Sequence, residues 1–520
     1  MNMLKKKSMT AAVVAGLAAV GAVGTAEAVH INPDGLGQVL IYPYYTAQRA
    51  AGATGTGNEY NTLLSVVNTT SQYKVVKVRF LEGKASREVL DFNLFLSPQD
   101  VWTGAVVPTT NGARVGTSDN SCVAPSDLFT RAPGTLADFK NLQYVGTPYS
   151  LAGTGLERTR EGYIEVLEMG VVTTAAVQAY IKHGASGIPG NCPALDSMDP
   201  GSGNTGAAIF SAMNHLTAPT GGLTGRASIL NPVTGAAYTY DAVALDAWTT
   251  AIQYTESGST LPSIGGGSSA QANIFVNGGV ISQGYAASID AVSAAMMRDT
   301  VINEFVLDAN STSSTDWVVT FPTKREYVTA MASAPFSNGF GAGGACDPFS
   351  ANVYNREENS PSTPSVLILP SPRPTVNPEV LNLCWEANVV PFQTASLLAS
   401  ANTNPLTTNL QSFVSGATST TGTRTSLASG TVQGPNGWFF MSFNTRARQQ
   451  LIPTSNTFNG TAFGTAPYTT ASAVDATLFI GRTYGLPTVG FMVHNYNRTG
   501  VASTYGGVIQ HKFTRLIPQT

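Results

Sequence analysis

Three strand-length runs between residues 62 and 107 constrain the fold of this chain most strongly. In the second and third runs, apolar and polar side chains alternate. The apolar positions are Val76, Val78 and Phe80 in one run and Leu90, Phe92 and Leu94 in the next. A short hairpin between these runs places Lys77 opposite Asp91 on a solvent-exposed face. Two apolar faces that point into one core predict a mainly β fold, an antiparallel β-sandwich of Ig-like or jelly-roll type.

Strand patterns recur at 160–170 and in the C-terminal ninety residues, whereas the middle of the chain differs. Apolar residues there recur at helical spacing in 173–184, 240–254 and 288–308, with strand-like runs between them.

These patterns suggest a division of the chain. We expect residues 29–170 and 431–520 to form one discontinuous β-sandwich domain that carries a mixed α/β insertion at 171–430. Residues 400–436 are rich in Ser, Thr and Gly and are expected to be a loop. Two independent domains in tandem are the alternative.

The N-terminus has the features of a Sec-type secretory signal peptide of bacterial type. Lysines at 5–7 precede a small apolar run at 9–24, and Ala26 and Ala28 form an A-x-A cleavage site. We expect residues 1–28 to be removed and the protein to reach the cell surface or the extracellular space, with the periplasm as the alternative. A transmembrane anchor is the competing reading, but the run is short for a span. We expect no membrane span in the mature chain, because no later apolar run is long enough.

Four cysteines in an exported chain predict two disulfide bonds. The pairing of neighbours, Cys122 with Cys192 and Cys346 with Cys384, closes the shorter loops, and two other pairings exist. Each bond would contribute roughly 3–4 kcal/mol to stability. Metal binding is the competing role, but the chain has no C-x-x-C and no histidine near a cysteine in sequence.

Low charge bears on the partners of the chain. Charged residues make up 11% of it, against roughly 25% in typical soluble domains. Such a surface lacks the like-charge repulsion that keeps molecules apart, which favours self-association into a homo-oligomer or an array. Without a basic stripe, nucleic acid is not expected as a partner.

Motifs for catalysis are missing from the sequence. It contains no G-x-S-x-G, no H-E-x-x-H and no G-x-x-x-x-G-K. Glu161 and Glu165 lie on one strand, but their Cα atoms would be about 13 Å apart, which is far for a glycosidase pair. We expect them on a solvated face beside basic neighbours. The chain is therefore expected not to be an enzyme, with no catalytic residues and no cofactor.

Calcium is the one ion for which the sequence offers a weak signal. Asp196, Asp199 and Asn204 lie in a glycine-rich stretch, and Asp34 lies in "NPDG". Neither stretch fits the spacing of an EF-hand loop. "NPDG" is first of all a turn, because Gly35 accepts a positive φ.

Aromatic residues occur in two clusters that could stack on sugars. They are Tyr42, Tyr44 and Tyr45 in one cluster, and Trp438, Phe439 and Phe440 in the other. Alternation along a strand should bury about half of each cluster. In the first of these strands Pro43 interrupts the hydrogen-bond ladder, which favours an edge position. Residues 36–45 are therefore a candidate for completing the sheet of a second copy.

Several long stretches resemble a family of secreted proteobacterial proteins that are described as hypothetical or cell-surface proteins. They are "YNTLLSVVNTT", "KVVKVRFLEGKASREVLDFNLFLSPQDVW", "REGYIEVLEMG" and "DWVVTFPTKREYV". The resemblance implies export and placement at the surface, and it supplies no catalytic residues.

Three classes of function follow. The leading expectation is a structural or interaction protein of the cell surface, such as an S-layer-like, filament or adhesin subunit that self-associates. A secreted protein that binds carbohydrate or another ligand, with cell-surface glycans among its partners, is the alternative. A secreted hydrolase is the third.

Overall fold

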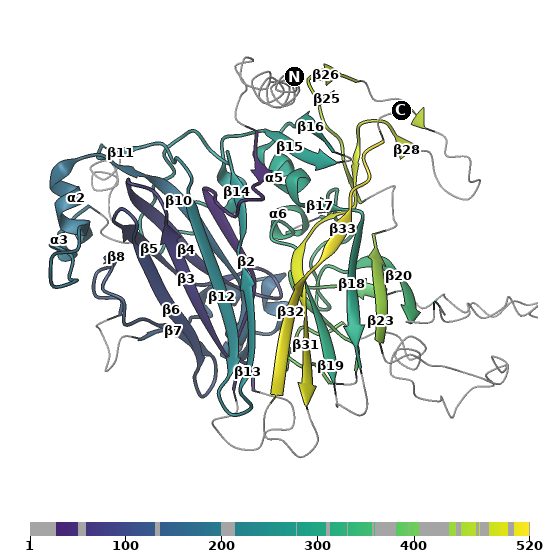
Figure 1. Cartoon of the computed structure of the whole chain (residues 1–520), viewed down its shortest axis with the longest axis horizontal. Helices are drawn as coiled ribbons and strands as arrows, with labels where there is room; N and C mark the ends of the chain where they lie inside the picture. The colour runs from purple at the N-terminus through teal and green to yellow at the C-terminus, as the bar shows by residue number, and fades with distance from the viewer. Residues whose placement is uncertain are drawn as a thin grey trace, which may run out of the picture.

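Two large antiparallel sheets face each other across one hydrophobic core in the N-terminal half of the chain (Figure 1). The fold is mainly β, as the sequence predicts. The computed structural model describes residues 28–49, 59–129, 136–198, 214–276, 278–307, 313–329, 331–355, 358, 381–393, 395–404, 436–443, 449–463, 467–468, 478–497 and 504–518. Residues 1–27 of the expected signal peptide and most of the expected loop at 400–436 lie outside these residues.

The first sheet has the strand order β1-β14-β2-β10-β4-β5-β8, and β11 also pairs with β10. Its strands are β1 (His30–Ile31), β2 (Val39–Thr46), β4 (Tyr73–Glu82), β5 (Glu88–Leu96), β8 (Val123–Ala124), β10 (Glu161–Val172), β11 (Leu216–Thr217) and β14 (Val243–Asp246). The second sheet has the order β13-β12-β3-β6-β7-β9. Its strands are β3 (Asn61–Asn68), β6 (Val101–Pro108), β7 (Ala113–Gly116), β9 (Leu136–Asp138), β12 (Leu223–Asn231) and β13 (Ala236–Asp241).

Two further sheets lie on the C-terminal side, in green and yellow in Figure 1. The middle sheet, with the order β22-β19-β31-β32, contains β19 (Ser314–Thr320), β22 (Ala387–Pro391), β31 (Val489–Asn497) and β32 (Thr504–Gln510). The outer sheet, with the order β21-β20-β23-β18-β33, contains β18 (Thr300–Val306), β20 (Asp347–Asn355), β21 (Leu381–Leu383), β23 (Asn436–Ser442) and β33 (Lys512–Thr514).

Smaller elements close the ends of these sheets. A four-stranded sheet consists of β15 (Gln271–Val276), β16 (Gly279–Gly284), β25 (Ser455–Phe458) and β26 (Thr461–Ala462). Three strand pairs are β17 (Met297–Arg298) with β30 (Leu486–Pro487), β24 (Gln450–Leu451) with β29 (Thr483–Tyr484), and β27 (Pro467–Tyr468) with β28 (Leu478–Phe479). The helices are α2 (Ala175–Ile181), α3 (Pro193–Asp196), α5 (Ser288–Met296) and α6 (Arg325–Val328), with 3-10 turns η1 (Leu142–Tyr144), η2 (Tyr149–Ala152), η3 (Leu156–Arg160) and η4 (Ile264–Gly266). No helix in the described part of the chain is long and apolar enough to cross a membrane.

Strands β19 and β22 and the first half of β31 are buried on both faces, and through them the middle sheet joins the two halves of the molecule. Val318 and Phe491 pack into the core of the N-terminal sandwich. Their strand neighbours Trp317 and Met492 pack into the core beneath the outer sheet. This burial explains why β19 and β31 are apolar on both faces rather than alternating.

The first sheet is also covered on both faces, which corrects the expected solvent-exposed face. Loop residues around Trp248 and helix α5 pack on its second side. Lys77 is therefore fully buried. It lies opposite Asn93 rather than Asp91, and reaches Asp91 diagonally, with Nζ 2.9 Å from Oδ2. The cause is a five-residue connection, 83–87, which shifts the expected register by two residues and leaves the faces unchanged.

Strand β2 corrects a second expectation, because it lies inside the sheet between β14 and β10 rather than at an edge. β14 pairs only with residues 39–41 of β2, and the β10 register shifts opposite Pro43. Neither neighbour needs an N–H from Pro43, so a proline is tolerated in an interior strand. Its carbonyl accepts a hydrogen bond from the Thr320 hydroxyl at 2.6 Å.

Two of the three expected helices change. The helix at 173–184 is confirmed as α2. The helix at 240–254 is wrong, because β14 forms there and pairs with β2. The helix at 288–308 is correct only up to Met296, where α5 ends and the β-branched run of β18 follows.

Strand pairing differs from the expected division of the chain. β12, β13 and β14 lie in the expected insertion, yet β12 and β14 pair with strands of the N-terminal segment. β23 and β31 pair with β18 and β19 of the same expected insertion. The N- and C-terminal segments nevertheless share one core, in which Leu40 and Phe491 belong to the same cluster.

Candidate functional site

Buried ion pairs lie on both faces of the first sheet: Arg79 is on the second face, and Lys74 is on the side that carries Val76 and Val78. Arg79 lies between two carboxylates, with Nε 2.6 Å from Glu88 Oε2 and Nη1 3.0 Å from Glu165 Oε2. Lys74 Nζ lies 2.5 Å from Glu168 Oε1. Burial raises the pKa of Glu88 and of Glu168, although the cationic partner of each acts in the opposite direction. These charges are compensated inside the protein, so the cluster holds strands together rather than facing a ligand.

Glu161 and Glu165 belong to different hydrogen-bond groups. The carboxylate of Glu161 accepts hydrogen bonds from the Tyr44 hydroxyl at 2.7 Å and the Ser400 hydroxyl at 2.6 Å. Glu165 pairs with Arg79. The expected basic neighbour is therefore present, but the expected solvated face is wrong, since both carboxylates are buried.

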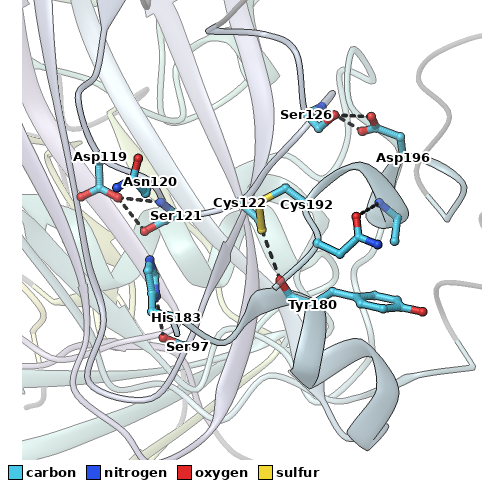
Figure 2. The surroundings of a disulfide bond; sticks show 12 residues. Ser97, Asp119, Asn120, Ser121, Cys122, Ser126, Tyr180, His183, Cys192 and Asp196 are labelled. Carbon is cyan, nitrogen blue, oxygen red and sulfur yellow. Dashed lines mark hydrogen bonds between the residues drawn. A yellow bond between two sulfur atoms is a disulfide. The ribbon is translucent and has the colours of Figure 1, made fainter. Parts of the chain in front are cut away.

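Both expected disulfide bonds are formed. Cys122–Cys192 joins the segment before β8 to the start of α3 (Figure 2). Cys346–Cys384 joins the segment before β20 to the residue after β21. The pairing of neighbours is confirmed.

The described residues that suggested a calcium site have structural roles. The Asp196 carboxylate accepts hydrogen bonds from the backbone N–H and the hydroxyl of Ser126 (Figure 2). Asp199 and Asn204 lie outside the described residues. At "NPDG" the backbone N–H of Asp34 donates to the Asn32 side chain, and Gly35 has φ +73° as the turn requires. Within the described ranges no group of three or more His, Cys, Asp or Glu side chains could hold a metal ion.

The tyrosine cluster of β2 does not reach the surface. Tyr42, Tyr44 and Tyr45 are fully buried, and their hydroxyls donate to Ser65 O, to Glu161 and to Thr159 O. Burial raises the pKa of each of the three phenols and is the largest cause of the shift. Stacking of a ligand on these rings is therefore not possible in the folded protein.

The second aromatic cluster does reach the surface, on the outer sheet. Phe439 is fully buried, whereas Trp438 is 48% exposed, so alternation along β23 is confirmed. The strand pairing places Trp438 directly beside Tyr354 of β20, which is 41% exposed. On the other side Trp438 lies beside Glu304 of β18.

A ladder of aromatic rings results, which we call the aromatic face and define by Tyr354, Trp438 and Phe440. The Tyr354 and Phe440 rings meet edge to face, with centroids 6.0 Å apart. Polar side chains at its margin are Glu304 and Asn352, both exposed. The opposite side of the same strands is fixed by the core beneath the outer sheet. The sequence indicated Trp438 and Phe440, but it gave no signal that Tyr354 would join them, because only strand pairing brings β20 to β23.

Comparison with known proteins gives no further guide: no family model, no curated protein and no solved structure matches the chain. The resemblance to secreted proteobacterial proteins stays an expectation.

Proposed function

We propose that the protein is an exported, non-enzymatic interaction protein of the cell surface that binds glycans through the aromatic face. The observation that carries this proposal is the exposed side chain of Trp438, which lies directly beside the exposed Tyr354 on the neighbouring strand. Exported placement is supported by the two disulfide bonds, which persist in oxidising compartments.

The geometry suits a flat polysaccharide. The C–H faces of pyranose rings pack on aromatic rings, which bury apolar area and keep their own polar groups wet. Neighbouring strands lie about 4.8 Å apart, a spacing similar to the length of one sugar ring. Glu304 and Asn352 can hydrogen-bond to hydroxyls at the margin. β-linked glucans, whose equatorial substituents leave both ring faces free, fit such a ladder best.

Co-sedimentation with insoluble cellulose or chitin tests the proposal. Trp438→Ala and Tyr354→Ala should each weaken binding about tenfold, since the loss of one stacking partner costs about 1.5 kcal/mol. Tyr505→Ala is the matched control, because Tyr505 is 64% exposed on β32, outside the aromatic face. Binding that all three variants retain would refute the proposal.

The aromatic face could instead mediate self-association, which the low charge of the protein favours. The same experiment detects this. In this case the native protein would sediment without any polysaccharide. If Trp438→Ala abolished this sedimentation and Tyr505→Ala did not, the aromatic face would be the contact between two copies of the protein. Self-association by insertion of residues 36–45 into the sheet of a second copy is not supported, because β2 lies inside its own sheet.

A further inference from the structure

A pocket of about 560 Å³ lies where the first sheet meets the C-terminal strands, away from the aromatic face. Ile31 of β1, Val243 of β14 and Val301 of β18 form apolar walls, together with Phe275 and Phe513. Its volume is within the range of small-molecule sites, which are mostly apolar with a few polar or charged groups.

Two arginines line this otherwise apolar pocket. Arg298 of β17 is only 5% exposed, and its guanidinium carbon lies 3.6 Å from the centroid of the Phe513 ring. Arg515 follows β33 and lines the same pocket. Burial lowers the pKa of Arg298, and the nearby positive charge of Arg515 lowers it further. Burial itself lowers the pKa of Arg515 to about 10.

Neither arginine has an ion-pair partner in the part of the chain that the structure describes. Arg515 donates to Phe275 O at 2.7 Å and to Ala295 O at 2.9 Å, and Arg298 donates to Met297 O at 2.9 Å. Arg515 Nε is buried without a hydrogen-bond partner among the described residues. Elsewhere in the core cations are matched with carboxylates, as Arg79 is.

The end of helix α5 compensates only part of this charge. Two of the carbonyls that accept from these arginines, Ala295 O and Met297 O, lie at its C-terminus, which carries about −0.5 of an elementary charge. Two guanidinium groups carry two positive charges, so more than one remains uncompensated. His511 adds none, because burial lowers its pKa to about 4, and it is neutral at physiological pH.

We propose that this pocket binds an organic carboxylate with an apolar body, of the size of a medium-chain fatty acid. The carboxylate pairs with Arg298 and Arg515, whose planar forks match its two oxygens. The apolar body displaces water from the walls around Val243 and Val301. Small inorganic anions fit less well, because with them bound the apolar walls stay in contact with water.

Calorimetric titration of the purified protein with decanoate, 1-decanol and sodium sulfate tests this proposal. Decanoate should bind at least tenfold more tightly than decanol, and sulfate should not compete with it. Arg515→Gln and Arg298→Gln should each weaken decanoate binding tenfold or more. Arg226→Gln is the matched control, because Arg226 is an exposed arginine paired with Asp241.

A further variant keeps the test decisive if Arg298→Gln does not fold. Val243→Trp fills the pocket without changing its charge and should abolish decanoate binding, while near-ultraviolet circular dichroism checks the fold. Equal affinity for decanol and decanoate, unchanged affinity in Arg515→Gln, or no binding of decanoate to the native protein would each overturn the proposal. Trp438→Ala should leave decanoate binding unchanged, which separates this site from the aromatic face.

Discussion

At the scale of single residues, the main difference from the predicted β-sandwich is that charged side chains are buried. Alternation predicts that Lys77 lies on the solvent side of its strand, and on that basis its removal should cost under about 1 kcal/mol. The structure covers that side, and Lys77 Nζ contacts Asp91 and donates to Glu256 O at 2.6 Å. Sequence alternation reports which residues share a face, but not whether a later segment covers it.

We therefore expect Lys77→Ala to destabilise the protein by about 3 kcal/mol or more, because it leaves the Asp91 carboxylate buried without its cation. Urea unfolding measures the loss. Lys512→Ala, at an exposed position, should change stability by no more than about 0.5 kcal/mol. A small loss for Lys77→Ala, equal to that of the control, would show that this face is open to water.

Glu386 should make stability depend on pH. Burial raises its pKa to about 8, although Lys324 opposes the shift. The folded state then keeps a proton that the unfolded state releases above its ordinary pKa of about 4.5. The resulting stability is complete below that ordinary pKa and is lost as pH rises towards 8, by up to about 1.4 kcal/mol per pH unit.

Urea unfolding of Glu386→Gln and the native protein at pH 5 and pH 8 measures this effect. The native protein should lose more stability than the variant over this interval. Glu304→Gln, at an exposed position, should keep the native pH dependence. An identical slope for the native protein and Glu386→Gln would contradict a buried, protonated Glu386.

At the scale of elements, short-range patterns predicted those strands whose partners are close in sequence. β4 and β5 were predicted from alternation and a turn, and α2 from helical spacing. The helix expected around β14 is wrong because Leu245, Trp248 and Ile252 recur at the spacing of a helical stripe although the chain there is not helical. Pairing with β2, two hundred residues earlier, decides the conformation there, and no local pattern contains it.

The interior position of β2 has a direct test. Leu40 is fully buried in the main core, so Leu40→Ala should cost about 2–5 kcal/mol. Leu63 is 42% exposed on β3, so Leu63→Ala should lower the free energy of unfolding by less than about 1 kcal/mol. Deleting residues 29–45 should prevent folding altogether. A soluble, folded protein after this deletion would mean that β2 is a removable strand.

At the scale of the whole molecule, the middle sheet turns two sandwiches into one body and positions both candidate sites. The aromatic face needs β20 beside β23, and the arginine pocket needs Arg298 and Arg515 to converge from distant parts of the chain. Neither juxtaposition leaves a local signal in the sequence. The cysteine pairing was predictable only because neighbours along the chain were also neighbours in space.

Protection of Trp438 from acrylamide quenching tests the glycan proposal most directly. Trp102, Trp248 and Trp317 are fully buried, whereas Trp438 is about half exposed, so the difference between the native protein and Trp438→Phe isolates this ring. With soluble hydroxyethyl cellulose, the quenching constant of the native protein should fall and that of Trp438→Phe should stay unchanged. An unchanged quenching constant in the native protein at saturating polysaccharide would contradict the proposal that the aromatic face is the glycan-binding surface.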